Sequence, residues 1–137
     1  MMKTKNNIEI QPIKHGRLLD VNCPSREFLQ HISSKWGILV LIALDNNTLR
    51  FSELRRKITG ISEKMLSQTL QVFENDGFIH RTMLPVMPPH TEYSLTPLGL
   101  EVYAQVIQLS DWIEINLPRI LNAGQATESK STINKKC

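Results

Sequence analysis

Hydrophobic and polar positions recur with the period of an α-helix over most of this chain. A first helix is expected to open at Cys23-Pro24-Ser25, because proline is well placed in the first helical turn and apolar residues follow at helical spacing. The segment from about Lys35 to Leu44 is apolar on nearly every side, which is typical of a helix at the centre of a domain. Thr48 to Phe51 is expected to be a short link, and Ser52 to cap a third helix that ends at Thr59-Gly60.

The segment from Ile61 to Asp76 separates into an apolar face and a polar face. Ser62 is a favourable N-cap, and Ile61 is placed to pack on Leu66 in the next turn. The polar face carries hydrogen-bonding side chains, namely Lys64, Ser67, Gln68, Gln71 and Asn75. Such side chains can contact base edges or phosphates, although a merely solvated exterior stays open as an alternative. Two short helices joined at Thr59-Gly60-Ile61 match the helix-turn-helix, whose second helix enters the major groove of DNA.

A strand pair and a long helix are expected after this motif. Phe78 to Leu84 is rich in strand-forming residues, a proline-rich segment that cannot pair follows it, and alternation resumes over Thr91 to Leu95. Thr96-Pro97 then opens a last helix with apolar residues at helical spacing, which is expected to end near Pro118. The predicted fold is mainly α with a small β-hairpin wing, the order of a winged helix-turn-helix.

Composition and charge narrow the class of protein. The chain has 137 residues, 41% hydrophobic and 21% charged, so we expect one globular domain over residues 18–121, a flexible arm over 1–17 and a disordered polar tail over 122–137. A membrane span and a secretory signal are both missing from the sequence, which predicts a cytoplasmic protein. The net charge is only +3, but a basic island from Arg50 to Lys64 lies within an acidic middle region. That island fits either a local phosphate-contacting surface or solvated helix faces.

Few residues offer catalytic or sensing chemistry. The histidines lack metal-ligand spacing, and no glycine-rich phosphate loop or Ser/His/Asp set is recognisable, so neither an enzyme nor a cofactor is expected. Cys23 stands at a predicted helix start, where the helix dipole favours a reactive thiolate, whereas a small packing residue is the alternative. No role is predicted for Cys137, and a disulfide between the two cysteines is not expected in a reducing compartment.

The sequence resembles the HxlR-type family of bacterial winged helix-turn-helix transcriptional regulators. Many short blocks in the same order carry the likeness between about Cys23 and Leu117. They are Cys23-Pro24, Lys35-Trp36, Arg50-Phe51-Ser52-Glu53-Leu54, Gly60-Ile61-Ser62-Glu63-Lys64-Met65-Leu66, Asp76-Gly77-Phe78-Ile79-His80-Arg81, Pro88-Pro89-His90-Thr91-Glu92-Tyr93-Ser94-Leu95-Thr96-Pro97-Leu98-Gly99 and Asp111-Trp112. The chain departs from the family at Ser33-Ser34, where a glycine pair is favoured, and at Gly37, where a hydroxyl residue is common.

The resemblance implies a sequence-specific regulator that acts as a homodimer on palindromic double-stranded DNA. The terminal helices are expected to hold the dimer, because the last helix offers more apolar surface than one small domain covers. The expected DNA contacts are Arg50, Ser62, Lys64, Ser67, Gln68, Gln71, Arg81 and His90. For Arg81, a structural role at the base of the wing stays open.

Two further expectations concern regulation and the competing class of protein. Some members of the resembled family sense oxidants, quinones or aldehydes through a cysteine at the Cys-Pro position, which makes Cys23 the candidate sensor of a small electrophile or oxidant. The alternative function is a winged-helix module that binds proteins and has no specific DNA site, because a fold does not dictate its function.

Overall fold

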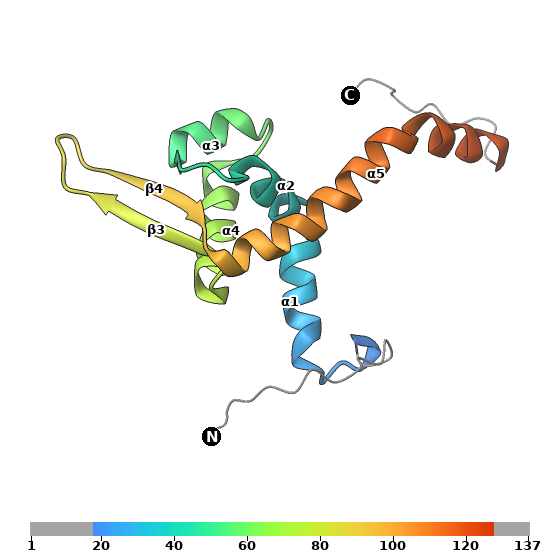
Figure 1. Ribbon diagram of the computed structural model, residues 1–137, viewed down its shortest axis with the longest axis horizontal. Coiled ribbons are helices and arrows are strands. Elements are labelled where there is room, and N and C mark those ends of the chain that lie inside the picture. Colours follow the sequence, from blue (N-terminus) through green and yellow to red (C-terminus); the bar gives the residue numbers. More distant parts are fainter. Residues whose placement is uncertain (1–17, 128–137) are drawn as a thin grey trace. The chain divides into compact units, whose positions relative to one another are not determined.

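The computed structural model describes residues 18–127, which form five α-helices and three β-strands (Figure 1). In chain order these are α1 (Pro24–Ser33), α2 (Lys35–Leu44), β2 (Leu49–Arg50), α3 (Phe51–Lys57), α4 (Glu63–Asp76), β3 (Ile79–Leu84), β4 (His90–Leu95) and α5 (Pro97–Thr127). The chain divides after Ser34 into two compact units, the first containing α1 and the second all the other elements. The predicted winged helix-turn-helix is confirmed.

The helix α1 has an apolar stripe but no buried residue. It begins with Pro24 in its first turn, as predicted, and Cys23 is the N-cap residue with an extended backbone. Phe28 and Leu29, which belong to the stripe, are both exposed. The first helix is therefore amphipathic, with an apolar side that faces solvent in this chain.

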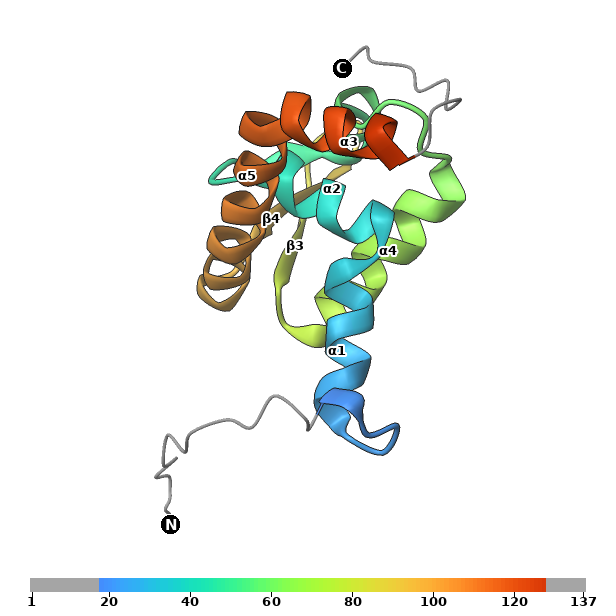
Figure 2. The same cartoon turned by 90° about the vertical axis from the view of Figure 1, so that its right-hand side faces the viewer.

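The core of the second unit is built around α2. Val40, Leu41 and Leu44 are fully buried, and α2 packs against α3, α4, β4 and α5 (Figure 2). This confirms the central position that the all-round apolar pattern predicts. The helices α3 and α4, and the C-cap residue of α3, contribute further buried side chains, namely Leu54, Ile58, Leu66, Leu70 and Phe73. Each fully buried side chain of this size contributes roughly 1.5–3 kcal/mol relative to an exposed one.

The helix-turn-helix is defined by local signals at its turn and ends. Gly60 in the turn has a φ of 93°, a conformation that glycine adopts without steric cost. The hydroxyl of Ser62 accepts a hydrogen bond from the backbone N–H of Met65 at 3.0 Å, so Ser62 caps α4 as predicted. Gly77 closes α4 with a φ of 87°, which confirms the predicted stop.

The link before α3 is a strand, which corrects two predictions. Leu49 and Arg50 form β2, which pairs antiparallel with β4 and gives a three-stranded sheet in the order β2-β4-β3. The helix α3 begins at Phe51, so Ser52 lies inside it rather than at its cap. Arg50 is the N-cap residue, and its backbone N–H donates to the carboxylate of Glu53 at 2.8 Å. A two-residue strand is too short to show an alternating pattern in the sequence.

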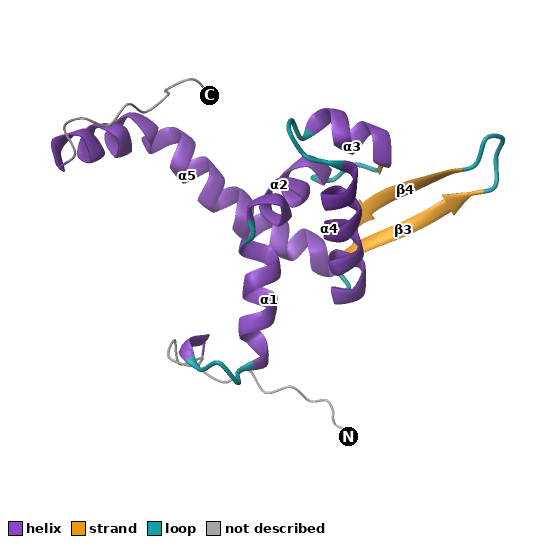
Figure 3. Cartoon of the chain, turned by 180° about the vertical axis from the view of Figure 1, so that it is seen from behind, coloured by secondary structure: helices purple, strands orange, loops and turns teal. Residues whose placement is uncertain are grey.

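The wing is the hairpin of β3 and β4, which extends beyond α3 and α4 (Figure 3). Its register runs from Ile79 opposite Leu95 to Leu84 opposite His90. The strand β4 therefore begins at His90, which corrects the prediction that alternation resumes only at Thr91 and that His90 belongs to the unpaired proline-rich segment. At the other end of β4, the hydroxyl of Thr96 accepts from the N–H of Gly99 at 2.9 Å and caps α5 as predicted.

The helix α5 corrects the prediction that the last helix ends near Pro118. It continues through Pro118 to Thr127, and Pro118 lies on an exposed part of the helix. Proline removes one hydrogen bond to the carbonyl of Glu114, and water can satisfy that carbonyl on an exposed helix. Residues 122–127, which were predicted to belong to a disordered tail over 122–137, continue α5. The predicted arm over 1–17 and residues 128–137, with Cys137, lie outside the described residues. Within the described range, no helix is long and apolar enough to cross a membrane.

Candidate nucleic-acid interface

The second helix of the motif, α4, presents a polar face to solvent. Lys64, Ser67, Gln68 and Gln71 are all exposed, whereas Leu66, Leu70 and Phe73 on the opposite side are buried. The separation into two faces, predicted from the helical period, is confirmed. The structure thus brings four of the predicted DNA contacts onto one helix surface.

The other predicted contacts come from separate elements. Arg50 is exposed in β2, immediately before α3. Ser62 is exposed, but its hydroxyl is engaged in capping α4. His90 lies next to the hairpin turn, and its Nε2 is 3.8 Å from the carboxylate of Glu92 on the same strand. His90 is therefore near the tip of the wing, whereas Arg81 lies in the middle of β3.

Arg81 and four residues of α4, two of them predicted DNA contacts, line one polar pocket, which we call the helix–wing pocket. It has a volume of about 350 Å³ and lies between α4 and the strands β3 and β4. Arg81 and Tyr93 are directly opposite partners in the antiparallel pair, so their side chains leave the same face of the sheet. The lining residues are Ser67, Leu70, Gln71, Glu74, Arg81 and Tyr93.

Sequence reasoning missed Tyr93 and Glu74 as members of this pocket. The available signal was the hairpin register, because any register that pairs β3 with β4 places one β4 residue opposite Arg81. Glu74 follows Ser67 by seven positions, which returns it to the same side of α4 after two helical turns. What the sequence alone does not show is how α4 packs against the wing, and this packing brings both residues close to Arg81.

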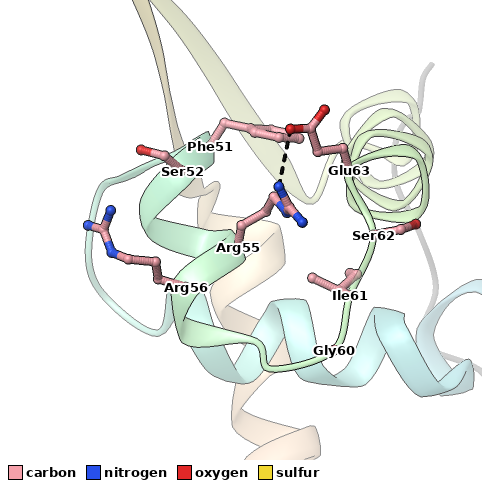
Figure 4. A pocket seen from close by; sticks show the side chains of 8 residues that line it. All are labelled: Phe51, Ser52, Arg55, Arg56, Gly60, Ile61, Ser62 and Glu63. Atoms are coloured by element: carbon pink, nitrogen blue, oxygen red, sulfur yellow. Dashed lines mark hydrogen bonds and ion pairs between the residues drawn. The ribbon is translucent and has the colours of Figure 1, made fainter.

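A second pocket, of about 650 Å³, lies between α3 and the start of α4 (Figure 4). Arg55 of α3 forms an ion pair with Glu63 of α4, with 3.1 Å between Nη1 and Oε2. Arg56 is exposed in the same lining and was missed as a candidate contact, although it lies on the first helix of the motif. The lining residues are Phe51, Ser52, Arg55, Arg56, Gly60, Ile61, Ser62 and Glu63.

The basic island is partly neutralised within the protein itself. Arg55 is paired with Glu63, and the ammonium of Lys57 donates to the carbonyl of Ala43 at 3.0 Å. Both cations therefore have partners in the chain, so fewer basic side chains remain for phosphates than the sequence count suggests. Since the Arg55–Glu63 pair is solvent-exposed, we expect it to contribute at most about 1 kcal/mol to folding.

Cys23 is a free, half-buried thiol at the start of α1. Its side chain makes no capping hydrogen bond, whereas its backbone carbonyl accepts from the N–H of Arg26 at 3.0 Å. The position at a helix start, which sequence reasoning emphasised, is therefore confirmed. Among residues 18–127, no group of three His, Cys, Asp or Glu side chains gathers as metal ligands would.

A winged helix-turn-helix with an exposed polar second helix defines a class of DNA-binding regulators. The chain belongs to the HxlR-like helix-turn-helix family, which it matches over residues 31–120. This confirms the resemblance drawn from the short sequence blocks. The protein is therefore an HTH-type transcriptional regulator of a non-enzymatic family.

Individual relatives agree with this assignment. The chain is 59% identical over 111 residues to the uncharacterized HTH-type transcriptional regulator YtfH of Escherichia coli strain K12, covering 81% of this chain and 88% of the relative. The solved structure of the transcriptional regulator YtfH from Salmonella typhimurium is 56% identical, with a TM-score of 0.75 over 79% of this chain and 96% of that one. The redox regulator HypR in its oxidized form is 35% identical, with a TM-score of 0.64 over 69% and 97% of the two chains.

Proposed function

We propose that the protein binds a palindromic operator as a homodimer, with α4 in the major groove and the wing beside it. The observation that carries this proposal is the exposed face of Lys64, Ser67, Gln68 and Gln71 on the second helix of the motif. Such a face has the donors and acceptors that read base edges or hold phosphates. The sequence identity to HTH-type regulators supports the same use.

The apolar surface of α5 supports the proposed dimer. Leu109 and Trp112 are 55% and 50% exposed, and the neighbouring Ile113 and Ile120 are exposed as well. By contrast, Val106 is only 7% exposed and belongs to the core of its own chain. A row of large exposed apolar side chains on one helix is typical of a protein interface. We propose that α5 forms most of the dimer contact, with help from α1.

An in vitro selection from duplexes with a randomised centre tests the proposed function. The wild-type protein is expected to enrich an inverted repeat whose half-sites lie about one helical turn, roughly 10 to 11 base pairs, apart. Gln68→Ala is expected to lose about 1–3 kcal/mol on the enriched duplex and to relax the preference at particular base pairs. Equal affinity for enriched and random duplexes at every salt concentration would exclude specific DNA binding. The alternative function, a winged-helix module that binds proteins, would then remain.

Control of this regulator through Cys23 is a second proposal. HypR is named as a redox regulator and has been solved in an oxidized and a reduced form, and this chain is 35% and 32% identical to those structures. The half-buried free thiol of Cys23 at the start of a helix supports a comparable use here. Diamide would take two electrons and two protons from two Cys23 thiols, which would join the protomers through one S–S bond.

Titrating operator binding with diamide tests this second proposal. We expect the native protein and Cys23→Ser to differ, because only the native protein has the thiol at the start of α1. Cys137→Ser is the matched control, since it removes the other thiol and is expected to respond like the native protein. A change of tenfold in operator affinity corresponds to a coupling of about 1.4 kcal/mol. An identical response of native protein and Cys23→Ser would return Cys23 to a packing role.

A further inference from the structure

We infer that the helix–wing pocket binds one phosphate of the DNA backbone, and that it divides the polar face of α4 into two stripes with different tasks. The inference rests on the proposed function, because it presupposes that α4 and the wing face DNA. Ser67 and Gln71 would then hold a phosphate together with Arg81 and Tyr93. Reading of base edges would be left to Lys64 and Gln68.

The chemistry of the pocket fits a singly charged phosphodiester. Its polar lining supplies a guanidinium from Arg81, hydroxyls from Ser67 and Tyr93 and a carboxamide from Gln71. All four are donors to phosphate oxygens, and hydroxyls, amides and arginines make most phosphate contacts in protein–DNA complexes. These groups come from α4, β3 and β4, so a phosphate bound there would fix the helix and the wing on the same strand of DNA (Figure 3).

The guanidinium of Arg81 is available for an external anion. Within residues 18–127, no carboxylate forms an ion pair with Arg81, and its side chain is exposed. This differs from Arg55 and Lys57, whose charges are engaged by Glu63 and by a backbone carbonyl. Arg81 therefore has the position and the free charge that a phosphate contact requires.

The position of the pocket separates the two stripes of α4. Ser67, Gln71 and Glu74 are spaced four and three residues apart, and all three line the pocket beside the wing. Lys64 and Gln68 are also four residues apart and exposed, but neither lines the pocket. In addition, the amide of Gln71 donates to the side-chain carbonyl of Asn75 at 3.2 Å, which fixes its orientation along the helix. The stripe of Ser67 and Gln71 therefore points to the sugar–phosphate backbone.

A substitution of Glu74 distinguishes phosphate binding by the pocket from a structural role of Arg81. The carboxylate of Glu74 lines the same pocket and opposes the entry of an anion. If the pocket binds a phosphate, Glu74→Gln should raise the affinity for every duplex. If Arg81 instead braces the wing through Glu74, the same substitution should lower thermal stability and weaken binding.

The first experiment compares affinity and base preference, using a duplex enriched by selection from a randomised library and a random-sequence duplex of the same length. Tyr93→Phe, Ser67→Ala and Gln71→Ala are each expected to weaken binding to both duplexes by similar factors, roughly tenfold where a hydrogen bond to a charged oxygen is lost. The base preferences of these variants should match those of the wild type. Gln68→Ala, in the other stripe, is the comparison that should change the preference.

The second experiment locates the phosphate. Neutral methylphosphonate groups are placed along the enriched duplex at both positions of one symmetry-related pair at a time, and binding of wild type and Arg81→Ala is measured for each pair. At one symmetry-related pair of positions, the neutral linkage should abolish the effect of Arg81→Ala. This variant should also lower the slope of log affinity against log salt by about one unit per protomer. Arg119→Ala, which removes the same charge from α5, should change neither result.

The possible outcomes distinguish a failure of the phosphate-pocket inference from a failure of the proposed function. An altered base preference in Tyr93→Phe or Gln71→Ala, or the absence of any methylphosphonate position that cancels Arg81→Ala, would overturn the phosphate pocket and leave the regulator standing. Enrichment of no sequence would overturn the specific regulator. In that case the phosphate pocket is tested with random-sequence duplexes alone. If both Arg81→Ala and Tyr93→Phe bind these duplexes with the affinity of the wild type, the phosphate pocket is overturned.

Discussion

The helices α4 and α5 distribute their apolar residues in opposite ways. On α4 the apolar face is covered by the chain's own core, with Leu66 and Phe73 fully buried, and the polar face remains exposed. On α5 the first half contributes Val106 to the core, but large apolar side chains such as Trp112 remain exposed. A polar exposed face fits a polar partner such as DNA, and an apolar one fits protein.

The largest predicted effect is the loss of folding stability when a residue of the buried face of α4 is substituted. Phe73→Ala is expected to lower the free energy of unfolding by about 3–5 kcal/mol, because it removes a fully buried ring and leaves a cavity next to Phe78. Urea unfolding followed by circular dichroism measures this loss. The matched control is Trp112→Ala on the exposed face of α5, measured at a concentration where the wild type is monomeric. A comparable loss in both variants would contradict the contrast.

The second prediction concerns the exposed face of α5. Leu109→Glu should weaken the proposed dimer by at least about tenfold, or about 1.4 kcal/mol, because a carboxylate would be buried without a partner at the interface. Sedimentation equilibrium gives the dissociation constant. Ala104→Glu is the control, since it adds the same charge to an exposed position on another side of α5. If the wild type sediments as a single chain at micromolar concentration, the assignment of this face to a second copy is wrong.

The contrast also shows why some features were predictable from the sequence and others were not. The caps at Ser62 and Thr96 and the glycine stop at Gly77 depend on side chains within a few residues, so their signals are local. The strand β2 exists only because β4 pairs with it, and β4 lies about forty residues further along the chain. Pro118 is a local signal that predicted a stop, but the exposed helix tolerates one missing hydrogen bond.

The candidate interface was predictable in the same uneven way. The polar face of α4 follows from helical period alone, so its four residues were found together. The helix–wing pocket joins three elements, and its Tyr93 and Glu74 were missed because their proximity to Arg81 depends on tertiary packing. The partners of Arg55 and Lys57 were missed for the same reason, so the sequence overestimated how many basic side chains of the island are available to phosphates.

A smaller effect is expected where α4 begins. Ser62→Ala should lower the free energy of unfolding by about 1 kcal/mol, because the N–H of Met65 loses the hydroxyl that accepts its hydrogen bond at 3.0 Å. Ser62→Asp restores an acceptor at the cap and should recover most of this stability. Urea unfolding of the three proteins checks the prediction. Equal destabilisation by alanine and aspartate would mean that the cap contributes little to folding.

The smallest expected effect concerns the first half of α5, where Tyr103 contacts the turn after α2. Burial raises the pKa of Tyr103 above its ordinary value of 10.0, and the hydrogen bond to Asp45 and the negative charges of Asp45 and Asp111 raise it further. The folded state therefore holds the phenol proton more tightly than the unfolded chain does. Its contribution to stability is fully present below pH 10 and is lost as the pH rises through the folded pKa.

Tyr103→Phe tests this anchoring of α5 to the core. The variant has no phenol proton to lose, so its free energy of unfolding should fall less steeply than that of the wild type as the pH rises above about 10. Urea midpoints measured at a series of alkaline pH values give the two slopes. Tyr93→Phe is the matched control, because it removes the other tyrosine of the chain, which lies in the wing. Only Tyr103→Phe should reduce the loss of stability at alkaline pH, since only Tyr103 ties α5 to Asp45. Parallel slopes for Tyr103→Phe and the wild type would mean that this contact does not hold the first half of α5 against the core.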